Sequence, residues 1–183
     1  MSDNKGMVYV FEGDGKGKTS AALGVAVRML LVGQRVEWIA WYKQRSWKTA
    51  EMGLPKVFGR NLRMHWTGEG FFGGPKDRAT FEGHKKAAEK ALLLAKRILK
   101  DGNKRVGLLV LDEVLRAVND GLLSINEVIK MIDLRRDTHL LLTGDKCPSR
   151  ILKKTDLVTR MKKIKHPFDK GMLAVSGPNF EEI

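Results

Sequence analysis

Short apolar runs alternate along the chain with longer segments in which apolar residues recur every three or four positions. The short runs predict buried strands, the last of them less apolar and therefore at a sheet edge: residues 7–12, 36–42, 62–66, 106–111, 138–143 and 157–162. The periodic segments predict helices over 19–32, from Pro75 and Asp77 to Lys100, over 124–136, and after Pro148. Ser124 and Glu127 predict a capping box at the start of the third of these helices. This alternation predicts an α/β fold with a mainly parallel sheet of about six strands.

The first predicted strand leads into a glycine-rich turn, which reads Gly13-Asp14-Gly15-Lys16-Gly17-Lys18-Thr19-Ser20. Its three glycines can take positive φ and leave room for a ligand, so backbone N–H groups can point at an anion. The helix that follows adds the positive end of its dipole. Lys18 supplies a cation for phosphate oxygens, and Thr19 or Ser20 a hydroxyl for a bound Mg²⁺. We therefore predict that residues 13–20 bind the phosphates of a nucleotide.

One position departs from the usual pattern, G-x-x-x-x-G-K-[S/T]. Glu12 stands where the first glycine is expected, and Gly13 follows one residue later. The alternative is a glycine-rich hairpin with accidental lysines. Because an apolar strand precedes the loop and an apolar helix follows it, the pattern favours a P-loop NTPase-like, RecA-like three-layer sandwich.

A second chemical feature lies at the end of the predicted strand 106–111, where Asp112 and Glu113 follow an aliphatic run. Mg²⁺ prefers hard oxygen ligands and commonly takes one or two carboxylates together with substrate phosphates. Thr19 with Asp112 or Glu113 can supply such a set. The alternative is that a carboxylate, Asp112 above all, caps the next helix. The loops at 43–47 and 67–75 leave carboxyl ends of strands and are expected to border the same crevice.

Length and composition suit one domain over residues 1–183, since 43% of the residues are hydrophobic and 30% are charged. No apolar run approaches the roughly 20 residues needed to cross a bilayer, and the first residues lack the apolar core of a signal peptide. We therefore expect a cytoplasmic protein without membrane contact. The single cysteine, Cys147, excludes an intrachain disulfide, and the four histidines are scattered.

The charge is unusual, because 34 Lys and Arg against 21 Asp and Glu leave a net charge of +13. Such an excess favours anionic partners such as polyphosphates or nucleic acid. The lysines are dispersed over predicted helix faces without aromatic RNA-binding motifs. A solvated basic surface therefore explains the charge better than a nucleic-acid site.

Several motifs occur together in the order seen in the P-loop-type corrinoid adenosyltransferases, which this chain resembles from end to end. They are the phosphate loop at 13–20, Leu-Asp-Glu-Val at 111–114, Leu-Thr-Gly at 142–144, Thr-Asp-Leu-Val-Thr-Arg-Met at 155–161 and Lys-His-Pro-Phe-Asp-Lys-Gly at 165–171. The resemblance implies transfer of the 5′-deoxyadenosyl group of ATP to the cobalt of a reduced corrinoid such as cobalamin, with release of triphosphate. It also implies Mg²⁺, a homodimer and a cobalt-reducing partner protein.

The resemblance further assigns roles to individual residues. Lys18 and a metal-binding Glu113 would neutralise the departing triphosphate. Phe71 would contact the corrinoid, and Phe72 is a candidate for the second ring, because Gly73 stands where the family has tryptophan. Further departures are Asp145 for arginine and Arg160 for glutamate.

Two other functions stay open at the level of sequence. One is a relative that binds or hydrolyses ATP without acting on a corrinoid, for which Gly73 is the support. The other is a basic, nucleic-acid-associated ATPase, supported only by the net charge.

Overall fold

The computed structural model describes residues 5–47, 49–74, 77–102 and 105–171. Its centre is one sheet of six strands, in the order β3-β2-β4-β5-β1-β6, and every pairing is parallel. The strands are β1 (Val8–Glu12), β2 (Val36–Ala40), β3 (Leu62–Trp66), β4 (Leu108–Asp112), β5 (His139–Gly144) and β6 (Leu157–Arg160). The predicted α/β class and the number of strands are confirmed.

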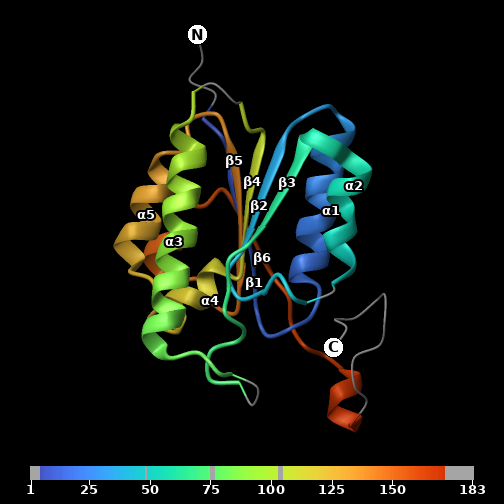
Figure 1. Ribbon diagram of the computed structural model, residues 1–183, viewed down its shortest axis with the longest axis vertical. Coiled ribbons are helices and arrows are strands. Elements are labelled where there is room, and N and C mark those ends of the chain that lie inside the picture. Colours follow the sequence, from blue (N-terminus) through green and yellow to red (C-terminus); the bar gives the residue numbers. More distant parts are fainter. Residues whose placement is uncertain (1–4, 48, 75–76, 103–104, 172–183) are drawn as a thin grey trace.

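Helices cover both faces of the sheet and complete the expected three layers (Figure 1). On one face lie α1 (Lys18–Leu31) and α2 (Leu54–Phe58), and on the other α3 (Phe81–Lys100) and α5 (Ile125–Asp133). Two short helices, α4 (Val114–Asn119) and α6 (Ser149–Leu152), pack into the core beneath α3 and α5. The 3₁₀ turns are η1 (Ala50–Gly53), η2 (Gly59–Asn61) and η3 (Pro167–Lys170).

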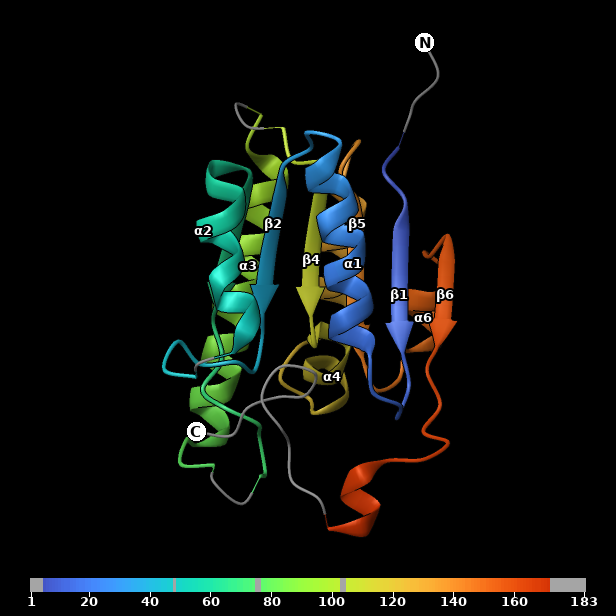
Figure 2. The ribbon, with the colours of Figure 1, turned by 90° about the vertical axis from the view of Figure 1, so that its right-hand side faces the viewer.

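The strands differ in exposure as the apolar pattern indicates. All residues of β2 and β4 are buried, whereas all four residues of β6 are exposed. Strand β6 pairs only with β1 and closes one side of the sheet, as its weaker apolar character predicts (Figure 2).

Several predicted boundaries are wrong. Helix α3 begins at Phe81 and not near Asp77, because Thr80 Oγ1 accepts the Gly83 N–H at 3.1 Å and so starts the helix there; Pro75 lies outside the described residues. Ser124 takes the capping position of α5 without a side-chain hydrogen bond, so the predicted capping box is not formed. The helical turns over 50–61, α4 and η3 were not predicted.

Because all six strands run in one direction, their carboxyl ends meet at a single edge of the sheet (Figure 2). None of the helices in the described part of the chain is long and apolar enough to cross a membrane.

Candidate active site

The phosphate loop joins β1 to α1 at the carboxyl edge of the sheet. Gly13 and Gly17 have φ values of +118° and +108°, which are open to glycine and costly for other residues. Gly15 has no positive φ; glycine is required there because a Cβ would lie 2.7 Å from the carbonyl carbon of Lys162. The helix begins at Lys18, directly after Gly17, so its first N–H groups face the loop.

Two amides of the loop are engaged by the protein and not directed at a ligand. The Gly13 N–H donates to the Asp145 carbonyl at 2.7 Å, and the Gly15 N–H donates to the Met161 carbonyl at 2.9 Å. The Asp14 carboxylate accepts the Lys163 N–H at 3.3 Å. The first half of the loop is therefore fixed against neighbouring segments, which leaves the N–H groups of its second half as the candidates for an anion.

Lys18 folds back over the loop that precedes it. Its Nζ donates to the carbonyl oxygens of Gly13, at 2.8 Å, and Gly15, at 3.0 Å. These bonds hold the ammonium group beside the backbone that would surround a phosphate. A lysine in this place can follow phosphate oxygens as a mobile cation.

Glu12 explains how the loop tolerates a residue other than glycine at its start. The side chain is buried, its Oε1 accepts Arg160 Nε at 2.7 Å, and its Oε2 accepts the Cys147 N–H at 2.6 Å. One carboxylate thus ties β1 to the end of β6 and to the segment after β5. Arg160 thereby has a partner in this chain despite its departure from the family pattern.

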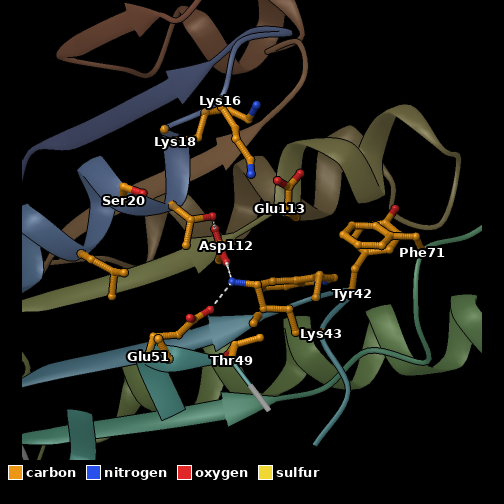
Figure 3. Close-up of a pocket in the computed structure, with 16 residues that line it drawn as sticks. Lys16, Lys18, Ser20, Tyr42, Lys43, Thr49, Glu51, Phe71, Asp112 and Glu113 are labelled. Carbon is orange, nitrogen blue, oxygen red and sulfur yellow. Dashed lines mark hydrogen bonds and ion pairs between the residues drawn. The ribbon is translucent and has the colours of Figure 1, made fainter. Parts of the chain in front are cut away.

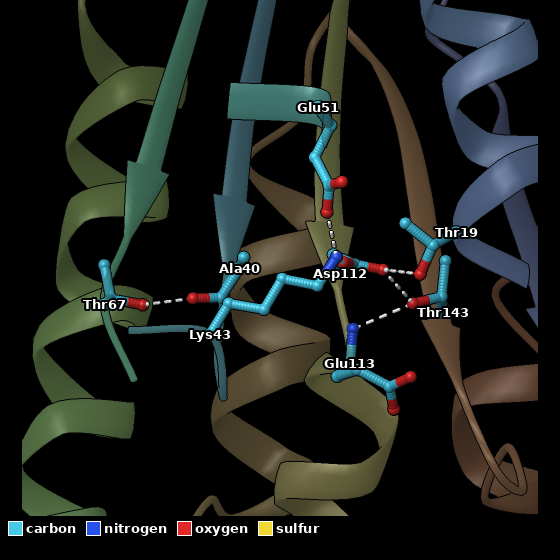
Figure 4. Close-up of polar contacts among 8 residues, drawn as sticks. All are labelled: Thr19, Ala40, Lys43, Glu51, Thr67, Asp112, Glu113 and Thr143. Carbon is cyan, nitrogen blue, oxygen red and sulfur yellow. Dashed lines mark hydrogen bonds and ion pairs between the residues drawn. The ribbon is translucent and has the colours of Figure 1, made fainter. Parts of the chain in front are cut away.

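Asp112 is buried at the end of β4 and is surrounded by donors (Figure 4). Its Oδ1 accepts the hydroxyls of Thr19, at 3.1 Å, and Thr143, at 2.9 Å. Its Oδ2 forms an ion pair with Lys43 Nζ at 3.3 Å. Asp112 does not cap α4, since the capping residue there is Glu113. The carboxylate instead orients the hydroxyl of Thr19.

Glu113 follows in a left-handed conformation, with φ +64°, that non-glycine residues rarely adopt outside functional sites. Its N–H donates to Thr143 Oγ1 at 2.8 Å, while Oε2 is buried without a hydrogen-bond partner among the described residues. Burial first, and then the charge of Asp112, raise its pKa to about 7. A buried carboxylate oxygen without a hydrogen-bond partner among the described residues, in a cavity that Thr19 also lines, fits a hard cation such as Mg²⁺.

Lys43 is a site residue that the motifs did not identify. It is buried after β2, and its Nζ lies 2.6 Å from Glu51 Oε1 in addition to its contact with Asp112. Burial alone would lower its pKa, but the carboxylates of Asp112 and Glu51 outweigh that effect and raise the pKa. In the sequence, the one sign of its role is that a lysine directly follows an apolar strand. No local pattern connects this lysine to Glu51.

A cavity of about 650 Å³ opens among these groups, a volume usual for small-molecule sites (Figure 3). Its polar lining comes from the second half of the phosphate loop, from β4 and from the segment after β2: Lys16, Gly17, Lys18, Thr19, Ser20, Lys43, Thr49, Glu51, Asp112 and Glu113. The lining does not include Gly13, Asp14 or Gly15, whose amides or side chains contact the segments named above.

The two candidate phenylalanines are separated. Phe71 lines the cavity and stacks on Tyr42, with ring centroids 5.7 Å apart and planes inclined by 17°. Phe72 is not part of this lining; it packs edge-on against Phe81, at 5.6 Å, and His84, at 5.4 Å. The structure therefore brings Phe71, but not Phe72, to the phosphate loop and the carboxylates.

A phosphate loop between β1 and α1 of a parallel sheet, facing two carboxylates at the end of β4, defines a P-loop nucleotide-binding protein. The family model described as ATP:corrinoid adenosyltransferase BtuR/CobO/CobP matches residues 4–180. The chain belongs to this family of transferases.

Curated relatives named corrinoid adenosyltransferase match over nearly the whole chain. A corrinoid adenosyltransferase of Pseudomonas aeruginosa is 33% identical over 97% of this chain and 85% of the relative. One of a Sinorhizobium species is 32% identical over 98% and 82%, and one of Escherichia coli K12 is 30% identical over 97% and 87%. The family suggested by the motifs is thereby confirmed, and the two alternative functions are not favoured.

Proposed function

We propose that the protein transfers the 5′-deoxyadenosyl group of ATP to the cobalt of a reduced corrinoid. The observation that supports this proposal is one cavity, in a chain of this family, whose lining includes the second half of the phosphate loop, Asp112 and Glu113, and the ring of Phe71. The reduced cobalt donates an electron pair to C5′ and a Co–C bond forms. The bond from C5′ to the triphosphate oxygen breaks, and triphosphate leaves with the electron pair of that C–O bond.

The residues at the loop can hold the triphosphate as a leaving group. Lys18 and the N–H groups at the start of α1 neutralise the triphosphate as its charge increases. Holding the triphosphate at the sheet edge also fixes C5′ in line with a cobalt presented from the Phe71 side. The protein supplies position and electrostatics, while the corrinoid supplies the nucleophile.

We propose that Mg²⁺ binds between the Thr19 hydroxyl, the Glu113 carboxylate and the phosphates of ATP. When bound, the ion adds positive charge against the leaving triphosphate. Glu113 Oε2 has neither a hydrogen bond nor an ion pair among the described residues, which supports its role as ligand. Asp112 has hydrogen bonds from Thr19 and Thr143 to its Oδ1 and an ion pair of its Oδ2 with Lys43, which support a positioning role. Thr19→Ala and Glu113→Gln should each weaken binding of ATP with Mg²⁺ about tenfold, and binding of ATP in EDTA much less. Equal losses in both titrations would contradict the metal assignment.

Two further features of the functional assembly are proposals. Because cobalt must arrive reduced and the chain has one cysteine, we expect a separate reductant, a partner protein in the cell. We also propose a homodimer; the exposed Leu157 and Val158 on the edge strand β6 are candidate contact residues. Sedimentation of the purified protein at several concentrations tests the dimer.

The deciding experiment combines the purified protein with ATP, Mg²⁺ and chemically reduced cobalamin. We expect adenosylcobalamin in the visible spectrum and an equal amount of intact triphosphate by ion chromatography. Lys18→Ala should lower the rate at least about a hundredfold, because the negative charge that develops on the triphosphate in the transition state loses a positively charged partner. Release of orthophosphate with an unchanged corrinoid spectrum would instead identify an ATPase and overturn the proposal.

A further inference from the structure

Three residues outside the recognised motifs form a connected unit behind Phe71: Tyr42 after β2, and Arg116 and Asp120 on and just after α4. We infer that Asp120, acting through Tyr42 and Arg116, positions the ring of Phe71 against the corrinoid end of the cavity. This inference rests on the proposed function. It assigns to Tyr42, and not to Phe72, the aromatic position beside Phe71.

Tyr42 packs directly against Phe71. The residue is 2% exposed and lines the cavity, and its ring lies nearly parallel to the ring of Phe71 (Figure 3). Its backbone also holds the loop that carries Phe71, because the Tyr42 carbonyl accepts the Gly70 N–H at 3.1 Å. At Gly68 a Cβ would lie 2.4 Å from the Tyr42 Cα, so this loop packs directly on the Tyr42 backbone. Ring and backbone of one residue thus fix the same loop.

Arg116 holds both rings from the side of α4. Its guanidinium carbon lies 4.9 Å from the centroid of Phe71 and 5.1 Å from that of Tyr42. Both distances fall within the range of cation–π attraction. Trp47 adds a further ring 5.5 Å from Phe71. Phe71 is therefore supported by a cation and two aromatic rings, although it lies on a glycine-rich loop.

Asp120 connects the two supports. Its Oδ2 accepts the hydroxyl of Tyr42 at 2.5 Å, and the same oxygen lies 3.6 Å from Arg116 Nε. Burial, together with the neighbouring carboxylate of Asp120, raises the pKa of Tyr42, so the phenol stays protonated and continues to donate. Asp120 does not line the cavity, so its influence on a substrate must pass through Tyr42 and Arg116.

Two variants test this role, one mild and one strong. Tyr42→Phe keeps the ring and removes only the hydroxyl, and Asp120→Ala removes the shared acceptor. Arg105→Gln is the matched control, because it breaks another Arg–Asp pair, to Asp137 at 3.0 Å, which lies on the exposed surface just before β4 and β5. The rate of adenosylation is measured while the concentration of reduced cobalamin is varied at saturating ATP. It is then measured while the concentration of ATP is varied at saturating cobalamin.

We expect kcat/KM for the corrinoid to fall about tenfold in Tyr42→Phe and further in Asp120→Ala, because loss of a hydrogen bond to a charged group releases the ring that contacts the substrate. KM for ATP should change less than about twofold, and the control should match the wild type. Unchanged corrinoid kinetics, or equal losses toward ATP and corrinoid, would overturn the inference.

Hydrogen–deuterium exchange of residues 67–74 in the ligand-free protein supplies a readout that does not depend on activity. Faster exchange in both variants supports the positioning role, and wild-type exchange contradicts it. If the wild-type protein forms no adenosylcobalamin, the proposed function fails, whereas the exchange experiment still decides whether Asp120 holds this loop.

Discussion

Glu12 shows how a single residue adapts a common motif. A carboxylate at the start of a phosphate loop would repel the phosphates if it faced them. Here it is turned away, buried, and saturated by Arg160 and the Cys147 N–H. The same contacts hold the segments after β5 and β6 against the loop. The departure from glycine at position 12 is therefore a structural anchor and leaves the anion site intact.

Glu12→Gln should lower the free energy of unfolding by about 2 kcal/mol, because a buried carboxylate that accepts charged and neutral donors is replaced by an amide whose NH₂ faces Arg160. Asp133→Asn, which breaks the exposed pair with Lys154, is the control and should cost less than about 1 kcal/mol. Urea unfolding monitored by circular dichroism measures both. Equal midpoints for the two variants would contradict the anchoring role.

The thiol of Cys147 is a second residue whose environment sets its chemistry. Burial, and then the charge of Glu12, raise its pKa to about 12 from the ordinary value of 9.0. The folded state therefore disfavours the thiolate, so the contribution of this group to stability is complete below pH 9.0 and declines as the pH rises toward about 12.

Iodoacetamide should accordingly alkylate Cys147 slowly in the native protein at about pH 8, and at least about a hundredfold faster in urea, since thiolate fraction and access both increase. Mass spectrometry of quenched samples gives both rates. Similar rates in the native and unfolded protein would show that the thiol is accessible in the fold.

Among the secondary-structure elements, helix starts illustrate what a local pattern does and does not determine. Thr80 and Ser124 are both hydroxyl residues at capping positions, yet only Thr80 accepts a backbone N–H. The sequence pattern favoured Ser124, where a glutamate follows three positions later. Whether the hydroxyl accepts a backbone N–H therefore depends on how the fold orients the segment that leads into each helix.

Thr80→Ala should therefore lower the free energy of unfolding by about 1 kcal/mol through loss of the α3 cap, and Ser124→Ala by clearly less. Guanidinium unfolding of both variants tests the difference, with the slope of the transition as a check that the folded and unfolded states are otherwise unchanged. A larger effect at Ser124 would reverse the assignment of the caps.

Most of the sheet could be predicted because each strand carries its own signal in a short aliphatic run, as β4 does before Asp112. The helical turns over 50–61 and helix α4 were missed because they are too short to show a periodicity. The phosphate loop was predicted because its chemistry is local. Lys43 lies in the loop over 43–47 that was expected to border the crevice, and it does line the cavity. The contacts of Lys43 and Tyr42 were missed because their partners, Glu51, Asp112 and Asp120, are brought to them only by the fold.

Over the whole molecule, the net charge of +13 and the nucleotide site are separate properties. Cavity residues Lys18 and Lys43 are already engaged by carbonyls or carboxylates, whereas many of the remaining lysines lie on exposed helix faces. The excess charge therefore acts on anions in general and adds little selectivity for the substrate.

A labelled oligonucleotide should bind weakly, and its affinity should fall at least about tenfold when salt rises from about 50 to about 200 mM, while ATP affinity changes much less. Lys18→Ala should weaken ATP binding and leave oligonucleotide binding unchanged. Fluorescence anisotropy measures the first and calorimetry the second. Tight, salt-insensitive oligonucleotide binding in competition with ATP would favour the nucleic-acid alternative.

The common direction of the six strands also has a practical use. The turn over 32–35 lies at the amino edge of the sheet, opposite the cavity, and Val32 is 70% exposed (Figure 2). With the native thiol shielded in the fold, Val32→Cys would introduce one selectively reactive position. A fluorophore attached there would report tumbling and assembly of the enzyme during turnover without obstructing the entry of either substrate.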